Sequence, residues 1–230
     1  MRRPLLLAAI LAALAVTAAG PASAQRRAAR PAATQDWTRV AVRTPEGGIR
    51  MGNPAARLKV IEYLSLTCPH CAEFAHEGGA GLMARVRTGQ VSIEYRHYVL
   101  NGLDVSASML ARCATPLNYF AMAHHLLGTQ QSWMRRTEGL TQAQRAEISA
   151  LPPLQIAQRL VPVLGLDAIG QRYGITPALR QRCMTQAGLD QLERMHGAAG
   201  QLGVGGTPTF FINGVRQNVN TWAGLAPLLR

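Results

Sequence analysis

The sequence contains a single lysine, Lys59, and only 12 acidic residues among 230. It has 24 lysine and arginine residues, so its positive charge comes almost entirely from arginine, and the formal net charge is +12 at pH 7. Such a surface favours acidic partners or anionic membranes at encounter. The basic residues are scattered, however, and aromatic residues make up only 5% of the chain. No motif or aromatic platform therefore indicates a nucleic-acid-binding protein.

Cysteine is also scarce, and four cysteines in 230 residues exclude a disulfide-dense scaffold. The sequence has no internal repeat. Its hydrophobic fraction of 48% is high enough for a packed core, which excludes wholesale disorder. The length corresponds to one medium-sized domain or to two small ones.

Only one long hydrophobic run occurs, and it lies in the first 24 residues. Arg2 and Arg3 precede twelve apolar residues (5–16), and Ala22-Ser23-Ala24 follows as an A-x-A pattern. Together these features predict residues 1–24 to be a secretory signal peptide, cleaved after Ala24. A membrane anchor is the alternative, but a spanning helix needs roughly 20 apolar residues. We therefore expect a soluble, exported protein in an oxidising compartment, where disulfides persist.

The remaining chain is expected to carry strands towards both ends and helices in the middle. Residues 25–36 are rich in Arg, Ala and Pro and are expected to form a flexible leader. A first part, residues 37–102, contains a short strand at 37–43 and two apolar, β-branched segments, 58–66 and 91–99, that are typical of buried strands. Residues 103–187 follow helical periodicity. Residues 188–230 contain a helix, a short strand, an Asn-Gly turn and a final helix. The pattern predicts an α/β domain with a helical insertion.

Several local signals place individual helices. Thr141-x-x-Gln144 resembles a capping box. Thr176-Pro177 predicts a helix N-cap followed by proline at the first helical position, with Gly188 just past that helix. Leu192, Met195, Ala199 and Leu202 are spaced as the apolar stripe of a further helix.

Four residues directly after the first apolar strand carry the chemistry. Cys68-Pro69-His70-Cys71 is a C-x-x-C motif at a strand-to-helix junction, the signature of a thioredoxin-type redox site. Cys68 is expected at the helix N-terminus, where free backbone N–H groups and the helix dipole lower the pKa of a thiol. Pro69 suits the first helical position, and His70 is expected to favour the thiolate further. Cys71, one turn on, is expected to be more buried and to act as the resolving thiol.

Two other interpretations of this motif remain open. The first is half of a metal site, with Cys68, Cys71 and His76 as ligands. A four-ligand zinc site usually brings a second C-x-x-C or an H-x-x-x-H motif, and the sequence has neither. The other is a purely structural disulfide, which stabilises little because the loop it closes is so short.

A second motif lies more than a hundred residues downstream. Gly205-Gly206-Thr207 leads into the apolar segment Pro208–Ile212, which is expected to be a short strand. Pro208 is a candidate cis-proline, although an ordinary trans proline at the start of a strand is the alternative. If the peptide bond is cis, we expect Pro208 to lie beside Cys68. The backbone of Thr207 is then available to pair with an extended substrate peptide.

Taken in order, these motifs resemble the DsbA-type thiol–disulfide oxidoreductases of the bacterial cell envelope. The resemblance covers residues 37–230 and rests on VIEYLSLTCPHCAEF, GVGGTPTFFINGV and the helical insertion between them. It implies a thioredoxin fold with an inserted all-helical domain and a periplasmic location. The implied activity is oxidation of reduced, newly exported proteins. A membrane quinone-linked reductase of the DsbB type is the implied reoxidant, and no cofactor is implied.

The resemblance also assigns roles to individual residues. Cys68 corresponds to the nucleophile, Cys71 to the resolving thiol and Thr207-Pro208 to the substrate-binding cis-proline loop. Glu62 falls where the family carries a buried acid that exchanges a proton with the resolving cysteine. An exposed strand carboxylate is the alternative for Glu62.

Two features depart from the family pattern. Threonine before the proline is shared with isomerase-type relatives, so a disulfide isomerase or reductase is the alternative function. Such isomerases usually carry an added dimerisation domain, and we expect a monomer because only residues 25–57 precede the central strand.

Gly78, Gly79 and Gly81 interrupt the active-site helix and are expected to weaken or kink it. A non-enzymatic module that binds anionic surfaces is a further alternative.

Cys113 and Cys183 both lie in the helical insertion, on apolar helix faces. In an oxidising compartment two remaining thiols favour pairing, and some DsbA-like proteins carry a second disulfide in this domain. Two buried free cysteines are the alternative. Such a bridge would close a long loop of the chain. The chain-entropy model gives about 4 kcal/mol as an upper estimate of its contribution to stability.

Overall fold

The computed structural model describes residues 35–230. The expected signal peptide and the leader up to residue 34 lie outside the described residues. None of the helices in residues 35–230 combines the length and the apolar character that a membrane crossing needs.

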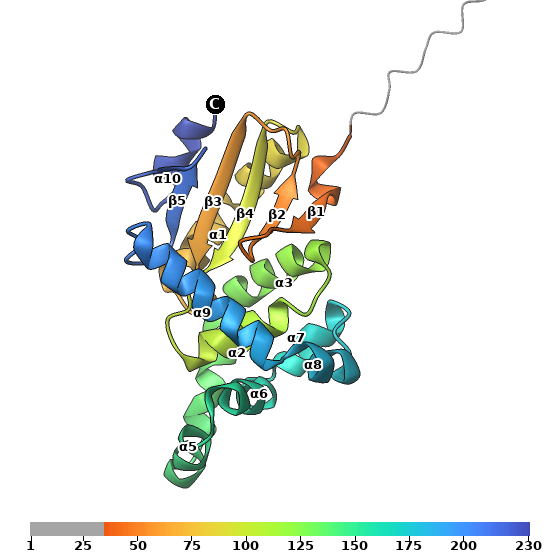
Figure 1. The fold of residues 1–230 in the computed structure, drawn as a ribbon, viewed down its shortest axis with the longest axis vertical. Helices are drawn as coiled ribbons and strands as arrows, with labels where there is room; N and C mark the ends of the chain where they lie inside the picture. Colours follow the sequence, from red (N-terminus) through yellow and green to blue (C-terminus); the bar gives the residue numbers. More distant parts are fainter. Residues whose placement is uncertain (1–34) are drawn as a thin grey trace, which may run out of the picture. The chain divides into compact units, whose positions relative to one another are not determined.

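A mixed sheet of six strands forms the centre of the described domain. Its spatial order is β1-β2-β4-β3-β5-β6. The strands are β1 (Ala41–Arg43), β2 (Ile49–Gly52), β3 (Leu58–Leu64), β4 (Val91–His97), β5 (Thr209–Ile212) and β6 (Val215–Arg216). The two central strands, β3 and β4, run parallel, and all other pairs are antiparallel. Figure 1 shows β3 and β4 pointing towards the helical part of the chain.

The two segments predicted to be buried strands form the central strands β3 and β4, which confirms the prediction. In β3 and β4 all but three of the side chains are buried. The expected strand at 37–43 is only partly correct. Residues Trp37–Arg39 form a short 3-10 turn, whose first amide groups are satisfied by Asp36, and only Ala41–Arg43 pairs with β2.

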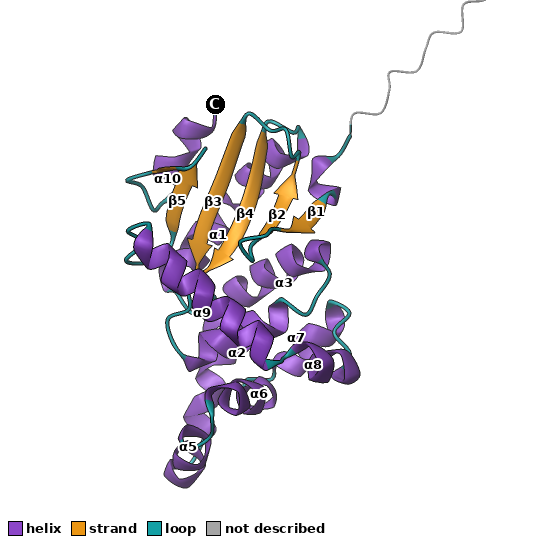
Figure 2. Ribbon diagram, viewed as in Figure 1, coloured by secondary structure: helices purple, strands orange, loops and turns teal. Residues whose placement is uncertain are grey.

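Helices cover the sheet and fill the long connection between β4 and β5. The first, α1 (Pro69–Arg87), follows β3 directly. The others are α2 (Gly102–Ala111), α3 (Pro116–Gly128), α4 (Gln130–Met134), α5 (Gln142–Ser149), α6 (Pro153–Val163), α7 (Leu166–Arg172), α8 (Pro177–Cys183), α9 (Gln186–Gln201) and α10 (Trp222–Leu225). No strand interrupts residues 98–208, and Figure 2 shows these helices gathered at one end of the sheet. The domain is therefore an α/β sheet with a helical insertion, as predicted.

The predicted helix caps are confirmed, whereas two helix ends are corrected. Thr141 and Gln144 form a complete capping box, and Thr176 caps α8 with Pro177 at its first position. That helix ends at Cys183, and Gly188 lies inside the next helix instead of beyond α8. Leu202 follows the end of α9 and is 52% exposed, so it is not part of the buried stripe of that helix.

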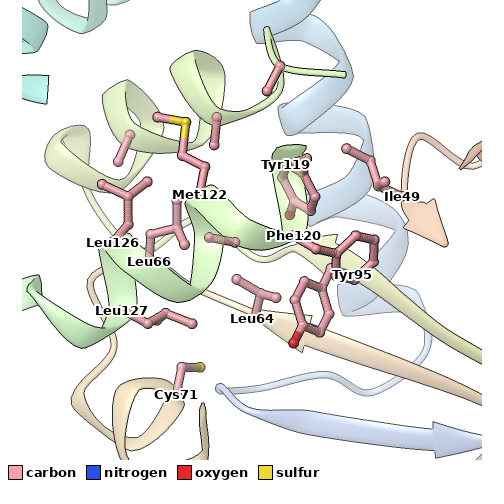
Figure 3. Close-up of a cluster of buried hydrophobic side chains, with 14 of the residues drawn as sticks. Ile49, Leu64, Leu66, Cys71, Tyr95, Tyr119, Phe120, Met122, Leu126 and Leu127 are labelled. Carbon is pink, nitrogen blue, oxygen red and sulfur yellow. The ribbon is translucent and has the colours of Figure 1, made fainter. Parts of the chain in front are cut away.

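Side chains on the two faces of β3 enter different parts of the core, because neighbouring residues of a strand point to opposite faces. Val60 and Leu64 belong to the large cluster that includes residues of α1 and α3. Figure 3 shows part of this cluster, with Leu64 and Tyr95 of the central strands near Cys71. Tyr63 belongs to a smaller cluster with Ala199 of α9. The sheet thus lies between α1 and α3 on one face and α9 on the other.

The glycines of α1 have a packing role that the sequence did not reveal. The helix continues from Pro69 to Arg87, so the three glycines do not interrupt it, and their weakening of the helix stays a prediction. A Cβ atom at Gly78 would lie 2.7 Å from the indole of Trp222, and one at Gly81 would overlap the same ring. These glycines therefore allow the C-terminal α10 to pack closely on the active-site helix.

The Gly78→Ala variant is expected to be less stable than the wild type by about 1–3 kcal/mol, because its methyl group overlaps the Trp222 ring. Alanine is otherwise the better helix former by up to about 1 kcal/mol. Gly197→Ala is the matched control, since Gly197 lies within α9 with no atom close to the added Cβ, and it should stabilise the protein. Unfolding in urea measures both. A Gly78→Ala variant as stable as the Gly197→Ala variant would contradict this packing role.

Cys113 and Cys183 form a disulfide, with a Cα–Cα distance of 5.6 Å. The bond joins the residues just after α2 to the end of α8 across 70 positions of sequence. It therefore links the first and last parts of the helical insertion.

Candidate active site

The C-x-x-C motif lies where β3 leads into α1, at the end of the central strand. Cys68 has extended backbone geometry and is the N-cap of α1, and Pro69 occupies its first turn. The carbonyl of Cys68 accepts the first helical hydrogen bond, from the amide of Ala72 at 3.2 Å. Both thiols are free in this structure. Cys68 is 5% exposed and Cys71 is fully buried, so Cys71 is the more buried of the two, as expected.

The surroundings of Cys68 favour its thiolate. Its pKa is lowered from 9.0 to about 5, chiefly because the thiol of Cys71 donates a hydrogen bond to it, while burial opposes the shift. The Thr207 side chain and the backbone N–H groups of Cys71 and His70 add smaller effects. The Thr207 hydroxyl is buried and has no hydrogen-bond partner within residues 35–230, so it is free to donate to the thiolate.

His70 acts differently from what the sequence suggested. Its ring nitrogen lies 3.5 Å from a carboxylate oxygen of Glu73, and both side chains are well exposed. The contribution of His70 to the lowered pKa of Cys68 comes through its backbone amide, not through its imidazole. The expected effect of the His70 side chain on the sulfur is therefore replaced by a backbone contact at the helix N-terminus.

The pKa of Cys71 moves in the opposite direction from that of Cys68. Burial raises it well above 9.0, and the hydrogen bond to Cys68 and the charges of Glu62 and Cys68 raise it further. One sulfur therefore carries the negative charge and its partner keeps the proton. This division suits a nucleophile and a resolving thiol respectively.

Glu62 is a buried acid beneath this pair. Its side chain is only 2% exposed, so the alternative of an exposed strand carboxylate is wrong. Burial, and then the charge of Cys68, raises its pKa from 4.5 to about 8. One carboxyl oxygen is buried without a partner in residues 35–230. A neutral Glu62 is thus placed to exchange a proton near the dithiol.

Tyr95 and His124 extend this buried polar region, and the sequence gave no sign of it. Tyr95 is opposite Glu62 in the parallel register of β3 and β4. Its hydroxyl lies 2.9 Å from Nε2 of His124, a half-buried residue of α3. Burial raises the pKa of Tyr95 and lowers that of His124. Both groups are therefore neutral at pH 7, with Tyr95 opposite the acid and His124 bonded to Tyr95.

Residues of the helical insertion hold the loop that precedes Cys68. The carboxylate of Asp104 accepts hydrogen bonds at 3.0 Å from the amides of Leu66 and Leu100. The Gln130 amide donates to the carbonyls of Leu66 and Cys68, at 2.9 and 3.0 Å. Both polar side chains are buried. They were not identified from sequence, because a lone Asp or Gln within a helical pattern carries no spacing signal.

The second predicted motif meets the first one in space. The Thr207–Pro208 peptide bond is cis, and the carbonyl oxygen of Thr207 lies 3.2 Å from the sulfur of Cys68. An open cavity of about 390 Å³ runs beside this loop. Its lining includes Gly203, Gly205, Gly206, Thr207, Pro208 and Thr209 on one side and residues 216–220 on the other. A groove of this kind, next to a reactive sulfur, can hold an extended peptide.

The described residues contain no cluster of side chains that could hold a metal ion. Within residues 35–230, His, Cys, Asp and Glu side chains do not come together in sets of three or more.

The fold and this pair of cysteines define a thioredoxin-type protein with an inserted helical domain. A family model described as thioredoxin matches residues 44–229. The chain belongs to this thioredoxin family.

Curated relatives point in the same direction. A protein of Rickettsia bellii is 25% identical over 182 residues, covering 77% of this chain and 61% of its own length. A protein of Rickettsia typhi is also 25% identical over 182 residues, covering 78% of this chain and 59% of its own. Both carry provisional names as protein-disulfide oxidoreductases. The chain spans about three fifths of the length of these relatives.

Solved structures share the architecture. The protein-disulfide isomerase from Novosphingobium aromaticivorans superposes with a TM-score of 0.71 at 27% identity, covering 78% of this chain and 94% of that one. The alpha-DsbA1 protein of Wolbachia pipientis superposes with a TM-score of 0.63 at 21% identity, covering 81% and 90%. The second likeness concerns the fold alone.

Proposed function

We propose that this protein is an exported thiol–disulfide oxidase that passes its Cys68–Cys71 disulfide to reduced, newly exported proteins. The observation that carries the proposal is the lowered pKa of Cys68, to about 5. A low thiol pKa stabilises the reduced dithiol relative to the disulfide, which raises the reduction potential of the pair. Its disulfide is therefore a strong oxidant of other thiols.

The proposed reaction has two exchange steps. A substrate thiolate attacks the sulfur of Cys68, the Cys68–Cys71 bond breaks, and Cys71 leaves as a thiolate. Glu62 gives its proton to Cys71, whose raised pKa makes the thiol its stable form. A second substrate thiolate then attacks the substrate sulfur of the mixed disulfide and releases Cys68 as a thiolate. The substrate loses two electrons and gains a disulfide, and the protein gains a dithiol.

The cis-proline loop supports the encounter that this reaction needs. Thr207 lies against the reactive sulfur, and the cavity beside it is open to solvent. An extended client segment that pairs with the backbone at Thr207 brings its cysteine to Cys68. Reoxidation of the dithiol falls to a membrane quinone-linked partner of the DsbB type, and the protein acts as a monomer in the periplasm.

A disulfide isomerase is the second candidate, because a solved structure described as a protein-disulfide isomerase is 27% identical to this chain. An isomerase must also attack wrong disulfides with its own thiolate, which is available at Cys68 in the reduced state. The two activities differ in the redox state of the protein that starts them and in the potential that they require.

Two assays on the purified protein distinguish these functions. When a few molar equivalents of the oxidised protein are added to a reduced, unfolded substrate, it is expected to form disulfides in that substrate. The reduced protein is expected to rescue a substrate with scrambled disulfides poorly. Efficient rescue together with slow oxidation would assign the isomerase function instead. Equilibration with glutathione buffers should give a potential well above that of an ordinary structural disulfide.

A further inference from the structure

The groove beside the cis-proline loop is almost free of charge. Eleven residues line it, and Arg216 is the only charged one among them. The others are glycines, Thr, Pro and Val, together with the amides of Gln217, Asn218 and Asn220. Amide side chains adapt their hydrogen bonds to many partners, so the one distinctive electrostatic feature of this groove is a guanidinium group.

Arg216 has no acidic partner in the described part of the chain. No Asp or Glu oxygen of residues 35–230 lies within 4.0 Å of its guanidinium, whereas Arg96 and Arg180 each have such a partner. Arg216 is exposed, and it ends β6 at the edge of the sheet. Its Nη1 atom reaches over the opposite wall, since a Cβ atom at Gly203 would lie 3.9 Å from it. The charge thus lies across the groove and is available to a bound molecule.

The same groove adjoins the reactive sulfur of Cys68. Thr207 lines it, and the Thr207 carbonyl oxygen contacts the sulfur of Cys68 at 3.2 Å. A client segment that is joined to Cys68 and pairs with Thr207 can extend along this groove, which Arg216 also lines. An acidic side chain close to the client cysteine gains an ion pair there, and a basic side chain meets repulsion.

We propose that Arg216 gives this site a preference for client segments that carry Asp or Glu close to the reacting cysteine. This inference rests on the proposed oxidase function and names the substrate class of that site. The pair is solvent-exposed, so the preference is modest, about two- to fivefold in rate. It declines as salt is raised, because exposed charges are screened.

The overall basic charge of the protein attracts any acidic peptide, and the test must separate this from a local effect. Two peptides with one cysteine and one aspartate have the same net charge. One carries the aspartate two residues from the cysteine, and the other carries it beyond a long glycine spacer. A third replaces the near aspartate by lysine. The rate at which the oxidised protein consumes each thiol is measured at low salt.

The near-aspartate peptide is expected to react about two- to fivefold faster than the spacer peptide, and the lysine peptide slower than both. Arg216→Glu should reverse this order, and Arg216→Gln should remove it. Arg172→Glu is the matched control, because Arg172 is exposed in α7 of the helical block and its replacement changes the net charge equally. It should keep the wild-type order.

Equal rates for the near and spacer peptides would overturn the preference while leaving the oxidase function in place. Loss of the order in Arg172→Glu as well as in Arg216→Glu would assign the effect to net charge and also overturn it. Failure of every peptide to react with the wild-type protein would instead overturn the proposed function, and the preference with it.

Discussion

The Cys68→Ser variant is expected to lose all measurable oxidation of a reduced, unfolded substrate. Serine has no sulfur to form the Cys68–Cys71 bond, and its hydroxyl is not a nucleophile towards disulfides. Cys71 does not substitute for it, because that thiol is fully buried and its pKa is raised. The measurement is the rate of thiol loss in the substrate, with the oxidised wild-type protein as reference.

A double variant, Cys113→Ser with Cys183→Ser, provides the control. It also removes a disulfide, but one that joins parts of the helical insertion and not the groove. It should oxidise substrate at a rate close to that of the wild type, with stability lowered by up to about 4 kcal/mol. Oxidation that persisted in Cys68→Ser, or that vanished only in the double variant, would place the activity at the other cysteine pair.

The Glu62→Gln variant is expected to be more stable than the wild type at neutral pH in the reduced state. Glu62 is buried and its pKa is raised from 4.5 to about 8. The folded protein therefore holds this proton more tightly than the unfolded chain, and stability falls as pH rises from about 4.5 to about 8. At pH 7 the penalty is about 3 kcal/mol, and glutamine, which carries no charge, removes it.

The pH dependence of this effect is its clearest signature. Near pH 4 the carboxyl is protonated in both states, so Glu62→Gln and the wild type should unfold at similar urea concentrations. Their difference should grow up to about pH 8. Glu73→Gln is the control, because Glu73 is an exposed residue of the same region and its replacement should change stability by less than about 1 kcal/mol. A Glu62→Gln variant that is less stable at pH 7 would contradict a buried, uncompensated acid.

The fold was predictable because its signals are local. The apolar runs of β3 and β4, the caps at Thr141 and Thr176 and the Asn213-Gly214 turn each report on a few neighbouring residues. The errors came from tertiary packing. The sequence showed the glycines of α1 only as a weakness of the helix, whereas the Trp222 ring occupies the space next to Gly78 and Gly81. Leu202 fits a helical stripe, yet the helix ends one residue earlier.

The site was predictable only as far as motifs reach. Cys68, Cys71, Thr207 and Pro208 stand in two recognisable motifs, and the structure brings both motifs together. Asp104, Gln130, Tyr95 and His124 surround the same centre without any sequence pattern of their own. Their roles depend on register and burial across separate elements. The imidazole of His70 was assigned an effect on the sulfur because it is adjacent in sequence, whereas the structure directs it to Glu73.

The most direct test of this account is the titration of Cys68, followed by the ultraviolet absorbance of its thiolate in the reduced protein. The arrangement of Cys71, Thr207 and the first amides of α1 predicts a midpoint near pH 5. A midpoint near that of an ordinary cysteine, about 8.5, would contradict it. The dithiol would then lack the stabilised reduced state on which the proposed oxidase depends.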